Sequence, residues 1–121
     1  MRIQPFLRDL RALLASPDAW HPLACVNVRG RLLGEFEQEP PSEARMVPTE
    51  AVAVAWNLPC AITHVLRCWE DAGRIGEPPA AYALRIAVEN EIGGAINTTE
   101  HRVALAALDA AIGRFAESRV A

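Results

Sequence analysis

The sequence predicts a mainly α-helical single domain: an orthogonal bundle of about four helices with a small β-hairpin or irregular insertion. Four segments repeat apolar residues at three- and four-residue intervals, which is typical of amphipathic helices. One stretch between the first two segments alternates apolar and polar residues instead, which is typical of strands. With 121 residues, 51% of them hydrophobic, the chain suits one domain (residues 1–121) with one core.

The first helix is expected at residues 5–15, followed by a short turn of helix. Ser16 fits an N-cap, Pro17 a first-turn proline and Asp18 an acid matched to the helix dipole. This turn would bring Trp20 to the body of the domain. The residues that share the apolar face of the first helix are Phe6, Leu10, Leu13 and Leu14.

Residues 23–36 predict a β-hairpin. Val26 and Val28 alternate with Asn27, and Arg29-Gly30 is a turn signal. The following residues, 35–50, contain five Glu and three Pro, so we expect an extended, solvated loop. An acidic docking element for an Arg-rich partner is the alternative for this loop.

The second half predicts three helices and a junction. Residues 49–56 are expected as a short helix or turn, and Asn57 as a junction and cap. The main helix then covers residues 58–72 and ends at Gly73, with Ile62, Val65, Leu66 and Trp69 as its apolar stripe. The next helix covers residues 80–92 and ends at Gly93-Gly94. Thr98 or Thr99 caps the last one, which runs to about residue 118.

The composition excludes several classes of protein. The net charge of −3 indicates neither a nucleic-acid binder nor a strongly acidic mimic of DNA. All twelve basic residues are Arg, which is typical of a GC-rich bacterial genome or one of its phages. Three cysteines are too few for a disulfide scaffold, so we expect reduced thiols in a cytoplasm. The sequence shows neither a signal peptide nor a membrane span, so a soluble cytoplasmic protein is predicted.

Cys60, His64 and Cys68 recur every four residues on the main helix and could carry chemistry. At 1.5 Å per residue, the two cysteines lie about 12 Å apart along the axis, so one metal ion cannot bind all three residues. The alternative function is therefore a metal- or thiol-dependent protein that uses Cys60 and His64. We favour buried cysteines on a helix that is covered on both faces, with no metal or cofactor.

The aromatic and charged residues suggest an interaction surface. Trp69 is expected in the core, whereas Trp20 and Trp56 lie at junctions, where core packing is favoured over an interface. Arginines concentrate in the N-terminal third, and the acidic loop follows them, which predicts a charge-asymmetric docking surface. The residues predicted to interact are Arg8, Arg11, Arg29, Arg31, Glu35, Glu37, Glu39 and Trp20.

Two stretches resemble a family of small proteins of unknown activity from actinobacteria and their phages. The first is Trp56-Asn57-Leu58-Pro59-Cys60-Ala61-Ile62, and the second is Ile96-Asn97-Thr98 followed by an Ala/Leu-rich helix. The family pairs a Trp-led Gly-Ala helix with a Trp-Asn-Asp turn before the final helix. The chain departs from this pattern at Cys60, Ile96 and Thr98, where the family has Gly, Trp and Asp. The resemblance implies a mainly helical domain in a phage or mobile-element context.

We therefore expect a small non-catalytic protein-interaction domain. Its partner is predicted to be a host or bacterial protein, with no direct binding to nucleic acid and none to membrane. One concrete instance is a phage or mobile-element accessory factor that inhibits a bacterial defence complex, as anti-CRISPR proteins do.

Overall fold

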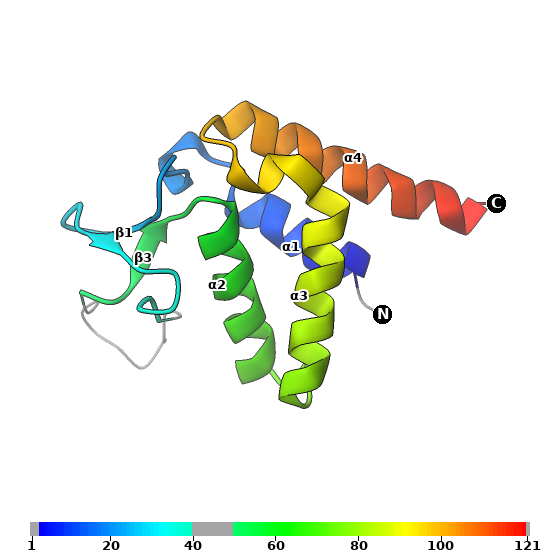
Figure 1. The fold of residues 1–121 in the computed structure, drawn as a ribbon, viewed down its shortest axis with the longest axis horizontal. Helices are drawn as coiled ribbons and strands as arrows, with labels where there is room; N and C mark the ends of the chain where they lie inside the picture. Colours follow the sequence, from blue (N-terminus) through cyan, green and yellow to red (C-terminus); the bar gives the residue numbers. More distant parts are fainter. Residues whose placement is uncertain (1–2, 40–49, 121) are drawn as a thin grey trace.

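Four α-helices make up most of the computed structural model, which describes residues 3–39 and 50–120 (Figure 1). A small sheet lies at one end of the helices, and two short 3₁₀ helices complete the described part. The predicted mainly α-helical fold with a small β insertion is thus confirmed. The elements are α1 (Ile3–Leu13), η1 (Pro17–Ala19), β1 (Cys25–Asn27), β2 (Leu32–Leu33), β3 (Ala53–Ala55), α2 (Leu58–Asp71), α3 (Pro78–Ile92), η2 (Gly93–Asn97) and α4 (His101–Val120).

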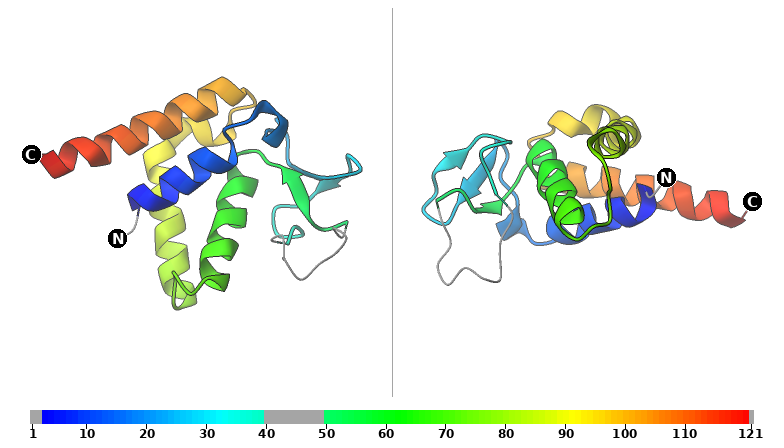
Figure 2. Two further views of the ribbon diagram at one scale, coloured as in Figure 1. Left: turned by 180° about the vertical axis from the view of Figure 1, so that it is seen from behind. Right: turned by 90° about the horizontal axis from the view of Figure 1, so that it is seen from below.

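The helices form two crossed pairs. α2 and α3 run side by side, and α1 and α4 form a second pair that crosses them (Figure 2). Phe6 of α1 is fully buried, and its ring meets Trp69 of α2 edge-on, with 5.2 Å between ring centroids. Among its described side chains, α4 buries Ala104, Leu108 and Ala111, and the two small alanines allow close approach to its neighbours.

The predicted boundaries of the main helix are confirmed. Asn57 is the N-cap of α2, and its side-chain oxygen accepts a hydrogen bond from the Cys60 amide at 3.1 Å. Gly73 follows the helix with a φ of +71°, a conformation that glycine adopts without strain. The helix is covered on both sides, because the predicted apolar stripe is buried and so are Cys60 and His64 on the other side.

The sheet has three antiparallel strands in the order β2-β1-β3. The predicted hairpin is confirmed: Cys25 pairs with Leu33, and Gly30 in the connecting turn has a φ of +81°. The expectation of a short helix or turn at residues 49–56 holds for a turn at residues 50–51 but is wrong for Ala53–Ala55, which forms β3 against β1. A three-residue strand is too short to show a period, and its partner lies far away in the sequence.

The predicted acidic loop falls mostly outside the described residues, which do not include 40–49. Its described beginning differs from the solvated loop that we expected. Gln38 is fully buried and Glu35 is partly buried, because both side chains turn toward α2. None of the helices in the described part of the chain is long and apolar enough to cross a membrane.

Candidate interaction surface

Exposed apolar side chains gather around the small sheet. Seven large hydrophobic residues are exposed in the described part of the chain, and five of them belong to the hairpin region or β3. This sheet segment, defined as residues 20–39 and 50–56, thus holds most of the large hydrophobic residues that are exposed in the described part of the chain. The seven residues are Leu23, Val28, Leu32, Phe36, Val54, Tyr82 and Ile86.

We define the apolar sheet face as Val26 of β1, its neighbours Leu32 and Val54 on the adjacent strands, and Val28 in the turn directly after β1. Val26 lies opposite Leu32 of β2. On the other side of β1 the register shifts, so that β3 places both Val54 and Ala55 beside Val26. Val54 is exposed whereas Ala55 is buried, so the irregularity turns one more apolar side chain outward.

Exposed ion pairs border this face. Arg29 contacts Glu50 at 3.1 Å, and Arg31 contacts Glu37 at 2.8 Å. The Glu37 carboxylate also accepts a hydrogen bond from the Gly34 amide at 3.0 Å. This backbone bond, followed by the contact with Arg31, lowers the pKa of Glu37. Three residues of the predicted interaction set, Arg29, Arg31 and Glu37, therefore lie together around the sheet.

The other predicted residues lie elsewhere. Arg8 is exposed on α1, and Arg11 pairs with Asp109 of α4 at 2.9 Å. Trp20 is half-buried: its indole N–H donates to the Thr99 carbonyl at 3.1 Å, and its ring lies 5.6 Å from that of His101. The Glu39 amide donates to the Ala51 carbonyl at 2.9 Å.

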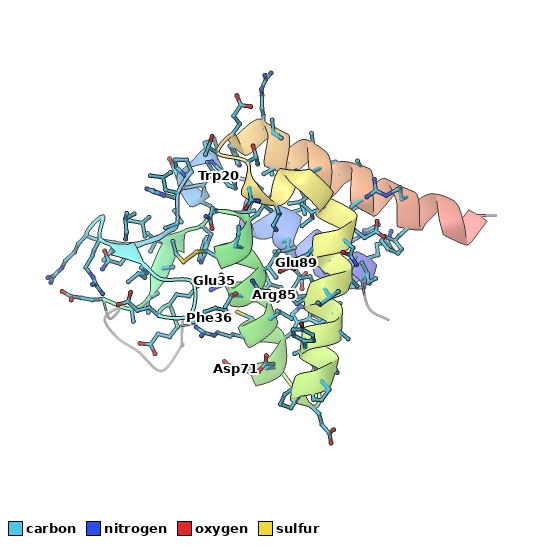
Figure 3. All side chains as sticks on the ribbon, in the orientation of Figure 1. Trp20, Glu35, Phe36, Asp71, Arg85 and Glu89 are labelled. Carbon is cyan, nitrogen blue, oxygen red and sulfur yellow. A yellow bond between two sulfur atoms is a disulfide. The ribbon has the colours of Figure 1, made fainter. Side chains whose placement is uncertain are left out.

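Glu35 is turned inward toward α2 and α3 (Figure 3). Its carboxylate accepts a hydrogen bond from the Thr63 hydroxyl at 2.6 Å and forms an ion pair with Arg85. Arg85 also pairs with Glu89 at 2.9 Å. Burial by itself lowers the pKa of Arg85, but the hydrogen bonds to Glu35 and Glu89 outweigh it and raise that pKa. Glu35 therefore attaches the sheet segment to the helices and is not free to meet a partner.

Gln38 is a second attachment, and sequence reasoning missed it. Its side-chain N–H donates to the Cys60 carbonyl at 2.8 Å, and its side-chain oxygen accepts from the Trp56 indole at 2.9 Å. Arg67 of α2 donates to the Gln38 carbonyl and to the Phe36 carbonyl. In the sequence, a glutamine between two glutamates shows no sign of burial, so no local signal could have found this contact.

Cys25 and Cys60 form a disulfide with 5.7 Å between their Cα atoms. The expectation that all cysteines are reduced is therefore wrong for these two, because the fold brings together positions that are 35 residues apart. Cys68 is free and partly exposed. In this oxidised state Cys60 has no thiolate with which to bind a metal or attack a substrate. The prediction of a cytoplasmic protein, which rested partly on reduced thiols, loses that support.

His64 and Cys68 are neighbours, with 3.7 Å between Nε2 and Sγ. His64 is buried against Trp56 at 4.7 Å between ring centroids, and its Nδ1 has no hydrogen-bond partner among the described residues. Burial, helped by the charge of Arg67, lowers the pKa of His64 to about 4. Burial and two nearby aspartates raise the pKa of Cys68. Both groups are thus neutral at pH 7, the opposite of an activated thiolate–imidazolium pair.

The described residues contain no group of three or more His, Cys, Asp and Glu side chains placed to hold a metal ion. Comparisons with protein families, with curated proteins and with solved structures find no match for this chain. The resemblance to small actinobacterial and phage proteins therefore stays a prediction.

Proposed function

We propose that this protein is a small non-catalytic domain that binds another protein through the apolar sheet face. The observation that carries the proposal is the concentration of exposed apolar side chains on the sheet segment. Leaving such side chains in water costs free energy, about 25 cal/mol for each Å² that a partner could cover. Exposed apolar side chains that lie near one another, beside polar and charged residues, are typical of a protein interface.

The rim supports a protein partner over nucleic acid. Around the apolar sheet face, Arg29 and Arg31 are each paired with a glutamate of the same chain. Phosphate binding needs unneutralised positive charge, which these two arginines, paired as they are, do not offer. The neutral states of His64 and Cys68 give no support to the alternative of a thiol-dependent protein.

The narrower function is an accessory factor of a phage or mobile element that inhibits a host defence complex. Its support is the small size of the chain, its Arg-only basic composition and the sequence resemblance. In this narrower form of the proposal, the partner is a bacterial protein of the defence complex.

A capture experiment tests the proposed surface. Tagged wild-type protein is mixed with an extract of the bacterium that carries the gene, beside a Leu32→Glu/Val54→Glu variant. The matched control is Tyr82→Glu/Ile86→Glu, which places the same charges on the exposed face of α3. We expect one bacterial protein, identified by mass spectrometry, to bind the wild type and the control but not the sheet variant.

Circular dichroism first establishes that all three proteins fold. Equal capture by the folded sheet variant would refute the proposed surface, as would loss of capture by the α3 control alone.

A further inference from the structure

The Cys25–Cys60 disulfide joins the two parts of the molecule. Cys25 lies in β1, the central strand of the sheet, and Cys60 lies in the first turn of α2. We propose that this disulfide is a redox switch that controls the apolar sheet face: the oxidised form presents it for binding, and reduction loosens it. The effect on binding rests on the proposed function, whereas the loosening of the sheet does not.

The disulfide adds a covalent bond to a sheet whose strands have only three, two and three residues. A sheet of this size is marginally stable unless it is packed against another element, and here Cys25, Leu33 and Ala53 supply that packing in the core shared with the helices. The side-chain hydrogen bonds of Asn27 in β1 stay within the sheet segment: they reach Arg29, Arg31 and Glu50. Gln38 and Glu35 attach the turn after β2 to the helices, but Cys25 is the residue of β1 that is bonded to α2.

The position of Cys60 favours exchange of the disulfide. Cys60 is the third residue of α2, directly after the Asn57 cap and Leu58-Pro59. Its sulfur therefore belongs to the end of the helix that carries partial positive charge, which stabilises a departing thiolate. Disulfides that release a stabilised thiolate are the more oxidising and more readily reduced ones.

The exchange needs a dithiol reductant. One thiolate of the reductant attacks the Cys25 sulfur, which forms a mixed disulfide and releases Cys60 as a thiolate. The second thiolate of the reductant then attacks the reductant sulfur that is bonded to Cys25. This closes the reductant's own disulfide and releases Cys25 as a thiolate. Two electrons and two protons pass from the dithiol to the protein, so that Cys25 and Cys60 end as thiols and the reductant ends as a disulfide.

Reduction changes the packing around Cys25 and Cys60. Both cysteines are buried, and two thiols need more room than the disulfide from which they come, because non-bonded sulfurs cannot approach to bonding distance. The surrounding core resists this expansion, so β1 moves away from α2. Because both sulfurs are buried, the reductant reaches them only through local opening of the sheet.

The first test measures the sheet without any partner. A Cys68→Ala variant, which keeps the disulfide and removes the free thiol, is equilibrated in dithiothreitol buffers of increasing reducing strength. Alkylation and mass spectrometry count the thiols, and amide hydrogen exchange follows the sheet and the helices. We expect two thiols to appear together, and exchange in residues 23–36 and 53–55 to become about tenfold faster on reduction, with α3 and α4 unchanged.

Other results would overturn the switch. Unchanged exchange in the sheet would mean that reduction has no structural effect. Equal acceleration in α3 and α4, or global unfolding on reduction, would make the disulfide a structural staple of the whole domain.

The second test adds binding to the captured bacterial protein. The oxidised and reduced forms are compared, together with a Cys25→Ser/Cys60→Ser variant that cannot oxidise. We expect at least tenfold weaker binding by the reduced form and by the double variant. If oxidised protein binds no partner, the proposed function fails, while the exchange experiment still decides the redox response of the sheet. Equal binding by both forms would refute the switch but leave the proposed function standing.

Discussion

The helical bundle and the sheet segment are stabilised in different ways. The bundle buries large apolar side chains contributed by every helix, such as Phe6, Leu58, Val88 and Leu108. The sheet segment buries one large aromatic side chain, Trp56, and otherwise mostly smaller ones, and the amide of Gln38 is fully buried as well. Cys25, Leu33, Ala53 and Trp56 pack in the core shared with the helices, and specific polar contacts and a disulfide add to this attachment.

This difference matters because hydrophobic burial is non-directional, whereas each hydrogen bond or disulfide depends on a particular pair of groups. We therefore expect the bundle to set the global stability of the protein. The sheet segment should respond locally to single changes, which suits a region that is proposed to bind and to be regulated.

Truncating one phenylalanine in each region gives the largest expected contrast. Phe6→Ala should lower the free energy of unfolding by about 4 kcal/mol, because it removes a fully buried ring that packs on Trp69. Phe36→Ala, in the sheet segment, should change it by about 0.5 kcal/mol or less, since 70% of that side chain is exposed. Urea unfolding followed by circular dichroism measures both. Equal losses would mean that the two regions do not differ as described.

Acid should weaken the contact between the two regions at His64. Burial lowers its pKa from 6.5 to about 4, so between these pH values the unfolded chain binds a proton that the folded protein does not. Stability is therefore lost as pH falls from 6.5 toward 4, by up to about 3 kcal/mol. Urea unfolding at pH 7 and pH 4 measures this loss, and His64→Leu should reduce it by that amount. An identical pH dependence in the variant would show that other groups cause it.

The bundle could be predicted from the sequence because its signals are local. The apolar periodicity that contains Phe6, the cap at Asn57 and the stop at Gly73 each act within a few residues. The strand Ala53–Ala55 gives no such signal, since it exists only through its pairing with β1. The Cys25–Cys60 pairing is equally non-local, because three cysteines do not reveal which two meet.

The candidate surface was predicted in part, and for a related reason. The distribution of charge along the sequence predicts a docking surface of arginines and glutamates. Of these residues, Arg29, Arg31 and Glu37 lie around the apolar sheet face. Their ion pairs, and the inward turn of Glu35, depend on contacts between distant segments. The outward apolar residues could be recognised only when the third strand and its irregular register were known.

Removing one buried amide in each region tests the polar attachment. Gln38→Ala should cost about 2 kcal/mol, because it leaves the buried Trp56 indole N–H without its partner and removes a hydrogen bond to the Cys60 carbonyl. Gln4→Ala in α1 is the matched control. Its side-chain hydrogen bond to the Ile112 carbonyl is long at 3.5 Å, so we expect a loss below about 1 kcal/mol. Calorimetry or urea unfolding compares the two variants. A larger loss of stability for Gln4→Ala would contradict the role of Gln38 as an attachment of the sheet segment.

The smallest expected effect comes from replacing one carboxylate oxygen of Glu35 with an amide nitrogen. Glu35→Gln keeps the shape of the side chain but weakens its bonds to Arg85 and Thr63, at a cost of about 1 kcal/mol. Glu37→Gln, whose carboxylate is exposed, should leave the unfolding midpoint unchanged. Amide exchange locates the effect, which we expect at residues 34–39. If α1 and α4 exchange faster instead, then the sheet segment and the bundle unfold as one unit, and loosening the sheet could not occur without unfolding the protein.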